Sequence, residues 1–254
     1  GVRPAEMLEL DQWVLARGEE VTRKCRAWYD ELAFHRVYQT LYNFATTDLS
    51  ALYFDVLKDR LYTAARTSKA RRSAQTALYR LTYALVRLLA PLMSFTTEEV
   101  WGHLWKPADA PESVHMALLP EPEELTEGLP AEQRGRCADW DRLVGVRDSV
   151  LKSLEVARKE TFIGAPLEAR VHLKANGDLY PLLERYAGEL PTLFIVSQVS
   201  MEADAETLLA VHVERAGGTK CERCWKYTYD VGAHPDLPTV CAACAEAVID
   251  NVRG

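Results

Sequence analysis

Apolar residues recur at steps of three and four along most of the first hundred residues, as on one face of an α-helix. Three long stretches follow this pattern, at 8–26, 35–54 and 68–90. Pro91 is expected to stop or kink the third stretch, because proline lacks a backbone donor and clashes with the preceding turn. These stretches predict three amphipathic helices.

A fourth, shorter helix is predicted after this proline. Thr96 and Glu99 have the three-residue spacing of a capping box, in which each side chain accepts a backbone N–H at the start of a helix. The helix is expected to run through Leu104. Four helices with short connections predict an antiparallel bundle over residues 1–105.

The composition changes after the bundle. Residues 106–136 hold five prolines and the acidic run EPEELTE, which together predict a linker that runs over the surface. Residues 137–215 mix helical and strand-like patterns and predict a small α+β junction domain. The expected elements are a long helix (132–160), a strand (167–173), a short helix (179–187) and two strands (192–199 and 208–215). The predicted fold class is therefore mainly α, with the bundle first, the junction domain next and a terminal module over 216–254.

Charge is distributed unevenly. The chain has 254 residues with a net charge of −7, which argues against a protein that simply coats nucleic acid. The bundle has 14 basic and 12 acidic side chains, whereas the acidity lies in the linker and junction. The longest apolar stretch, 81–93, is interrupted by Arg87 and Pro91, so no membrane-spanning helix is expected.

Four of the six cysteines form the strongest local motif. Cys221, Cys224, Cys241 and Cys244 have the pattern C-x2-C-x16-C-x2-C, which is typical of a four-cysteine zinc site. Two residues between cysteines let one tight turn direct both thiolates at one ion. Two disulfides or four unrelated thiols are the alternative, but disulfides need an exported protein and no export leader is visible.

A zinc ion with four sulfur ligands has no open position for water, so the predicted metal is a single structural Zn²⁺. The other two cysteines, Cys25 and Cys137, lie in phase with the apolar face of predicted helices. Core packing is the expected role of both.

Arg223, Trp225 and Lys226 lie between and beside the first two cysteines. A guanidinium and an indole in this position are able to hold a phosphate and stack an unpaired base, and such stacking contributes about 1–3 kcal/mol per base. The alternative is that Trp225 only packs over a metal module with little other core.

These residues also carry a family resemblance. The segment KCERCWKYTYDVG at 220–232, followed by CAAC, resembles the carboxy-terminal zinc module of bacterial isoleucyl-tRNA synthetases. Upstream segments resemble the anticodon-binding helical bundle of the same enzymes and occur in the family's order. They are LDQWVLAR (10–17), FHRVYQTLYNF (34–44), DLSALYFDVLKDRLY (48–62), ARRSAQTALYRL (70–81) and LLAPLMSFTTEEVW (88–101).

The resemblance implies that the bundle and zinc module bind the anticodon stem-loop of isoleucine tRNA. It assigns anticodon contact to Arg223 and Trp225, with Lys226 beside them. Arg71 and Arg72 open a predicted helix and are candidates for phosphate contact, although a solvated helix face is the commoner role of such a pair. The second cysteine pair has the sequence CAAC where a basic residue is expected, which predicts fewer phosphate contacts there.

The family's catalytic signatures, similar to HIGH and KMSKS, do not occur in the sequence. We therefore expect the chain to be the detached carboxy-terminal third of a synthetase, with no catalytic residue of its own and ATP used only by the absent catalytic domain. Alone it is expected to be inactive, monomeric and cytoplasmic. The alternative function is a free-standing zinc-containing protein that binds nucleic acid.

Overall fold

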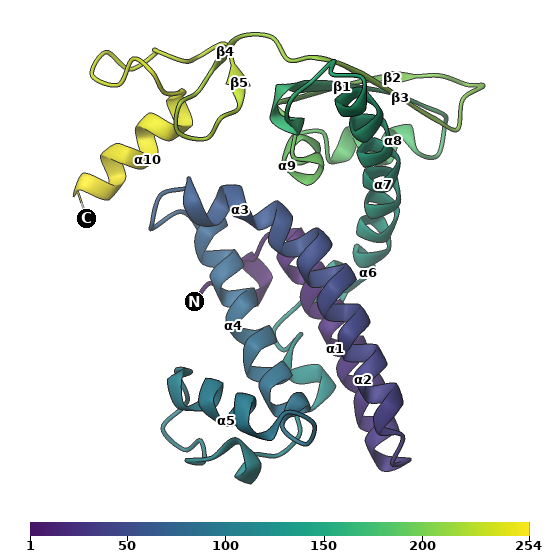
Figure 1. Cartoon of the computed structure of the whole chain (residues 1–254), viewed down its shortest axis with the longest axis vertical. Helices are drawn as coiled ribbons and strands as arrows, with labels where there is room; N and C mark the ends of the chain where they lie inside the picture. The colour runs from purple at the N-terminus through teal and green to yellow at the C-terminus, as the bar shows by residue number, and fades with distance from the viewer. Residues whose placement is uncertain (254) are drawn as a thin grey trace. The chain divides into compact units, whose positions relative to one another are not determined.

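The structure is a computed structural model that describes residues 1–253, apart from the side chains of 134, 135 and 253. It consists of two compact units, whose helices and strands are labelled in Figure 1. The first unit comprises Gly1–Asp55 and Lys69–Cys137, and the second comprises Val56–Ser68 and the chain from Ala138 onward.

The first unit is a helical bundle, as predicted. Helix α1 packs against both α2 and α4, and α4 packs against α5. The helical segments are a 3-10 turn (Pro4–Glu6), α1 (Glu9–Asp30), α2 (Phe34–Asn43), a π-helix (Phe44–Phe54), α4 (Lys69–Leu89) and α5 (Ser94–His103). The apolar positions of the periodic pattern form the core: Trp13, Leu15, Val37, Phe44, Ala77, Leu81 and Leu88 are all buried.

One buried carboxylate joins three of these helices. Asp11 on α1 is fully buried, and its two oxygens accept hydrogen bonds from the Tyr53 hydroxyl at 2.8 Å and the Ser73 hydroxyl at 2.5 Å. Tyr53 belongs to the π-helix and Ser73 to α4. A buried charge is tolerated where it receives such hydrogen bonds, so this network fixes the three segments against one another.

Two helix boundaries differ from the prediction. The second helical stretch does not end at 54 but continues as α3 (Asp55–Tyr62). The capping box at Thr96 is wrong, because α5 already begins at Ser94 and has no side-chain hydrogen bond at its N-cap, Met93. The Pro91 prediction is confirmed, since α4 ends at Leu89.

Residues 106–136 pack on the bundle rather than crossing open solvent. They include two 3-10 turns (Val114–Met116 and Pro122–Glu124) and α6 (Ala131–Gly135). Val114, Leu125 and Thr126 are buried. The division of the chain into four domains stays a prediction, because the compact units follow different boundaries.

Arginines of the bundle hold this acidic segment in place. Arg26 donates to the carbonyls of Leu119 and Pro120, at 3.2 Å each. Arg87 pairs with Glu124 at 2.5 Å and lies over the Tyr83 ring, 4.4 Å from its centroid. Part of the bundle's positive charge is therefore already neutralised by its own chain.

The second unit contains a three-stranded sheet with strand order β2-β1-β3, covered by helices. The central strand β1 pairs in parallel with β2 and antiparallel with β3. Its alternate residues Ala169, Val171, Leu173 and Ala175 are buried. The elements are α7 (Cys137–Lys159), a 3-10 turn (Pro166–Glu168), β1 (Ala169–Ala175), α8 (Tyr180–Arg185), α9 (Leu190–Phe194), β2 (Gln198–Ala203) and β3 (Leu209–Arg215).

The predicted strand at 192–199 is wrong in its first half. Residues Leu190–Phe194 form α9, and β2 begins only at Gln198. Pro191 lies in the first turn of α9, where its missing N–H has no helical partner to lose. Ile195 then ends the helix in a left-handed conformation, with φ 58°.

The chain ends in a small module with little regular structure. It has two short strands, β4 (Thr219–Lys220) and β5 (Tyr227–Thr228), and one helix, α10 (Ala242–Arg253). Its apolar cluster consists largely of cysteines, with Val231 and Val240 packed against them. Within the described chain, no helix has the length and apolar character needed to cross a membrane.

Candidate functional site

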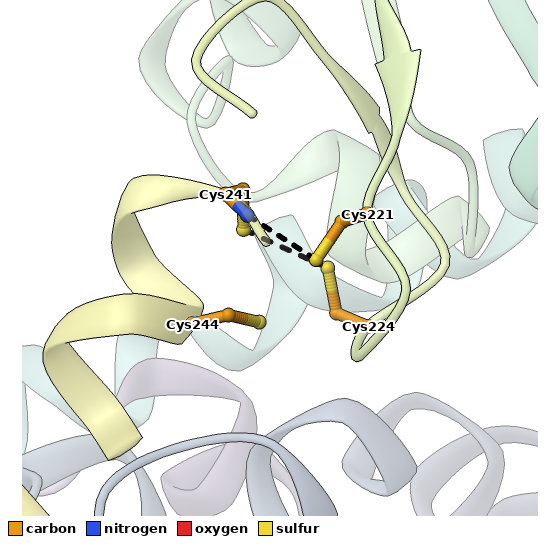
Figure 2. Close-up of side chains that lie close together, drawn as sticks. All are labelled: Cys221, Cys224, Cys241 and Cys244. Atoms are coloured by element: carbon orange, nitrogen blue, oxygen red, sulfur yellow. Dashed lines mark hydrogen bonds between the residues drawn. The ribbon is translucent and has the colours of Figure 1, made fainter. Parts of the chain in front are cut away.

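Four cysteines from two segments meet in the terminal module (Figure 2). Cys221 and Cys224 lie on the turn between β4 and β5, while Cys241 and Cys244 lie at the start of α10. The four sulfur atoms are all within 4.8 Å of one another. The structure therefore brings together every residue of the predicted metal site.

The spacing of these sulfurs fits zinc. A tetrahedral site with Zn–S bonds of about 2.3 Å has its sulfurs about 3.8 Å apart, and the Sγ atoms of Cys224 and Cys241 are 3.8 Å apart. No two cysteines are joined in the structure, which contradicts the disulfide alternative. Three of the four ligands are buried, so the arrangement is a closed structural site.

Backbone N–H groups support the thiolates. The turn is closed by hydrogen bonds of 2.9 Å from Trp225 N to Cys221 O and from Cys221 N to Lys226 O. Burial opposes ionisation of Cys221, but the N–H groups of Cys224, Cys241 and Arg223 lower its pKa to about 6. Burial raises the pKa of Cys241 to about 11 and also raises that of Cys224. Metal ions are bound by deprotonated cysteines, so a bound cation would offset the burial that opposes ionisation of these ligands.

Trp225 is the exposed member of the three residues that flank the first cysteine pair. Its side chain is 62% exposed, which contradicts the alternative that it packs over the module. Its backbone has φ 64°, in the left-handed region that a bulky residue rarely adopts. The indole is thus held outward at the cost of backbone strain.

Arg223 and Lys226 are half-buried, and both contact the segment that ends α3. The Arg223 guanidinium donates to the Thr63 carbonyl at 2.5 Å and lies 3.5 Å from the Cys244 sulfur. The Lys226 ammonium is 2.5 Å from the Asp59 carboxylate. A groove of 860 Å³ lies between this segment and the module. Their predicted RNA contacts stay predictions.

Arg71 and Arg72 lie in the first turn of α4, in the first unit. Arg72 is exposed and donates to the Gln75 side chain at 3.1 Å. Arg71 is half-buried and also interacts within the chain. Contact with phosphate stays a prediction for both residues.

Sequence reasoning missed the partners of the flanking cations. Asp59 lies on α3, which continues the second periodic stretch, and Thr63 directly follows this helix; both are more than a hundred residues from the cysteine motif. No local spacing connects them to Arg223 or Lys226. Only the folded chain places them together.

Two family comparisons match this geometry. Residues 11–173 match the anticodon-binding domain of tRNA ligase, and residues 218–247 match the zinc finger found in FPG and IleRS. The second match contains all four cysteines and identifies the metal as zinc. The first covers most of the chain and favours the synthetase over a free-standing zinc protein.

Curated relatives agree with both matches. The chain is 43% identical to an isoleucine–tRNA ligase from Symbiobacterium thermophilum, over 96% of this chain and 27% of the relative. It is 44% identical to the enzyme of that name from Moorella thermoacetica, again over 96% and 27%. The corresponding enzyme from Kosmotoga olearia is 40% identical, over 94% and 26%. The chain thus spans about a quarter of the length of these relatives. With its helical bundle and terminal zinc module, the chain belongs to the family of anticodon-binding domains of tRNA ligases.

Proposed function

We propose that this chain is the tRNA-binding part of an isoleucine–tRNA ligase and that it binds the anticodon stem-loop of isoleucine tRNA. In this role it works as a monomer in the cytoplasm and positions the tRNA for a catalytic domain elsewhere in the enzyme. Support comes from the anticodon-binding match and from the isoleucine–tRNA ligases among the relatives.

The exposed and strained Trp225 is the observation that carries the proposal. Anticodon loops present unstacked bases, and proteins read such bases by stacking aromatic rings on them and by hydrogen bonds to their edges. An indole that is 62% exposed beside the metal site presents such a ring to solvent. The left-handed backbone of Trp225 belongs to the turn of the first cysteine pair, where its N–H donates to the Cys221 carbonyl at 2.9 Å, so the turn at the metal site directs the indole outward.

Phosphate contacts complete the proposed interface. Arg71 and Arg72 are the candidate phosphate contacts on the bundle, whereas Arg223 and Lys226 of the zinc module already have protein partners, Thr63 and Asp59. Attraction between such cations and phosphate falls off over about 8 Å at physiological salt. The net charge of −7 is therefore compatible with a local RNA-binding face.

Binding to matched tRNAs tests this proposal. The purified chain is titrated with isoleucine tRNA and with the same tRNA carrying a changed anticodon, at several stated salt concentrations. We expect the changed anticodon to weaken binding by about tenfold, since a base edge that no longer matches leaves a buried polar group unpaired at a cost of about 1–3 kcal/mol. Equal affinity for the two tRNAs would remove anticodon recognition from the proposal.

A further inference from the structure

Residues 59–67, called here the docking segment, comprise the end of α3 and most of the turn that leads to α4. We propose that Arg223 and Lys226 are positioning residues that fasten the zinc module to the docking segment, and that Arg223 couples this docking to metal binding. The docking segment and the module belong to the same compact unit.

Arg223 caps the end of α3. The last carbonyls of a helix lack partners within the helix, and the negative end of the helix dipole favours a cation there. Helix α3 ends at Tyr62, and the Arg223 guanidinium donates to the next carbonyl, that of Thr63, at 2.5 Å. The contact therefore satisfies a helix end as well as joining two segments.

Lys226 makes a second contact one turn earlier. Its ammonium is 2.5 Å from Asp59 Oδ2, while Asp59 Oδ1 accepts a hydrogen bond of 2.8 Å from the Thr63 hydroxyl. The Lys226 and Asp59 side chains are only 26% and 31% exposed. Partial burial reduces the screening of this pair relative to an open surface pair.

Helix α10 contacts the other end of the docking segment. The Thr67 hydroxyl donates to Asp250 at 2.8 Å, and the backbone N–H of Arg66 donates to the Asn251 side chain at 3.2 Å. Because α10 begins at the second cysteine pair, both halves of the metal site are connected to the same short segment.

Arg223 joins this interface to the metal ligands. The nitrogen that donates to Thr63 also lies 3.5 Å from Cys244 Sγ. Groups that hydrogen-bond to metal ligands fix the orientation of those ligands. A bound ion that holds Cys244 in place therefore also holds the guanidinium toward the docking segment, and loss of the ion loosens both.

This assignment separates the roles of the three flanking residues. Arg223 and Lys226 are half-buried with protein partners, whereas Trp225 is exposed. Arg223 and Lys226 thereby fix the position of the turn that carries the Trp225 side chain. Their removal is expected to disturb the module even in the absence of RNA.

The test uses the full chain loaded with zinc and contains no RNA. Hydrogen exchange is measured at the backbone amides of 59–67, and zinc affinity is measured by competition with a chelator. Arg223→Gln is expected to weaken zinc binding by about tenfold, as for other groups that orient ligands, and to raise exchange. Lys226→Met is expected to raise exchange by about fivefold, as for a lost ion pair, with zinc affinity within about twofold of wild type.

Lys220→Met is the matched control, because Lys220 is an exposed cation of the same module on β4. It is expected to leave both readouts unchanged. Zinc removal from the wild-type chain is expected to raise exchange at 59–67. A double-mutant cycle with Asp59→Asn and Lys226→Met keeps the test informative if Arg223→Gln fails to fold. If the two changes have additive effects on hydrogen exchange at 59–67, the ion-pair contact is refuted.

The proposal is overturned if Arg223→Gln and Lys226→Met match the control in both readouts. It is also overturned if Arg223→Gln leaves both unchanged but reduces the salt dependence of tRNA binding by about one ion, the behaviour of a phosphate contact. Because exchange and zinc affinity are measured without RNA, failure of the proposed tRNA function leaves this inference independently testable.

Discussion

Trp225 has a backbone in the left-handed region, with φ 64°, and a side chain that is 62% exposed. A left-handed conformation costs a residue with a Cβ about 1–2 kcal/mol, and glycine adopts it almost freely. Packing does not repay this cost, since the indole is largely in solvent. Contact of the ring with RNA is the role proposed for this outward position.

Replacing Trp225 by glycine is therefore expected to separate stability from binding. Trp225→Gly should be more stable than Trp225→Ala by about 1 kcal/mol, because only glycine relieves the strain. Both variants should lose about 1–3 kcal/mol of affinity for isoleucine tRNA. Thermal unfolding of the zinc-loaded chain and tRNA titration measure the two effects. Wild-type affinity in either variant would show that the ring does not contact RNA.

Cys25 is a buried thiol of the bundle core, unlike the four cysteines of the metal site. It is fully buried on α1, as predicted, and burial raises its pKa to about 12. The reactive form of cysteine is the thiolate. The thiol is therefore expected to resist alkylation at pH 8 in the folded chain and to react once the chain is unfolded in urea. Mass spectrometry of the alkylated peptides measures this difference, and rapid native modification would contradict the burial of Cys25.

Among the elements, the acidic segment 106–136 forms a strap that hydrogen bonds and an ion pair hold against the bundle. Its turn Pro122–Glu124 opens with a capping box formed by Glu121 and Glu124, so the box occurs here and not at Thr96. Glu124 also pairs with Arg87, whose side chain is only 9% exposed. Burial opposes ionisation of Glu124, but hydrogen bonds from Arg87 and the Glu121 backbone lower its pKa.

Removing this carboxylate is expected to destabilise the first unit. Glu124→Gln leaves a buried guanidinium without its counter-ion and should cost about 1–2 kcal/mol, less than for a fully buried pair because Glu124 is 41% exposed. A carboxyl whose pKa is lower in the folded chain than in the unfolded chain stabilises the fold at pH values above its unfolded pKa. This stabilisation is lost as the pH falls through the folded pKa. The difference between Glu124→Gln and wild type should therefore disappear in acid.

Urea unfolding at several pH values measures this effect. Glu123→Gln is the matched control, since Glu123 is the neighbouring residue, is 66% exposed and lies 3.5 Å from Arg23. Its cost should stay within about 0.5 kcal/mol. Equal effects of the two substitutions at neutral pH would show that the strap does not depend on Arg87.

At the scale of the whole molecule, the two units and the terminal module differ in what holds them together. The bundle has a large apolar core, and the three-stranded sheet is covered by α7, α8 and α9 (Figure 1). The terminal module has a small apolar cluster of cysteines with Val231 and Val240, and buried Ala245 and Ala247 on α10. Metal binding contributes about 10–16 kcal/mol in small zinc modules, which is ample to replace a core.

Zinc removal is therefore expected to unfold the terminal module alone. After chelation, trypsin should cut rapidly at Lys220 and Lys226, while the bundle stays resistant and most of the helical circular dichroism remains. Zinc should restore protection, and magnesium should not, because it prefers oxygen ligands. Continued protection of Lys220 and Lys226 after complete metal removal would contradict a metal-dependent module.

The sequence predicted features that depend on neighbouring residues better than features that depend on residues far apart in the chain. The helices of the bundle and the four metal ligands follow from local spacing, because a helix repeats every 3.6 residues and one turn directs two cysteines. The strand predicted at 192–199 failed where apolar content alone did not distinguish a short buried helix from a strand. The Thr96 capping box failed because the same spacing also occurs inside a helix.

Patterns of neighbouring residues were enough to predict the helices of the bundle, the zinc ligands and the family, since each depends on residues close together in the chain. Which cations already have protein partners became visible in the folded chain alone. It placed Arg223 on Thr63, Lys226 on Asp59 and Arg87 on Glu124. Such pairings depend on how distant segments pack, and a charge pattern read along the chain does not contain that information.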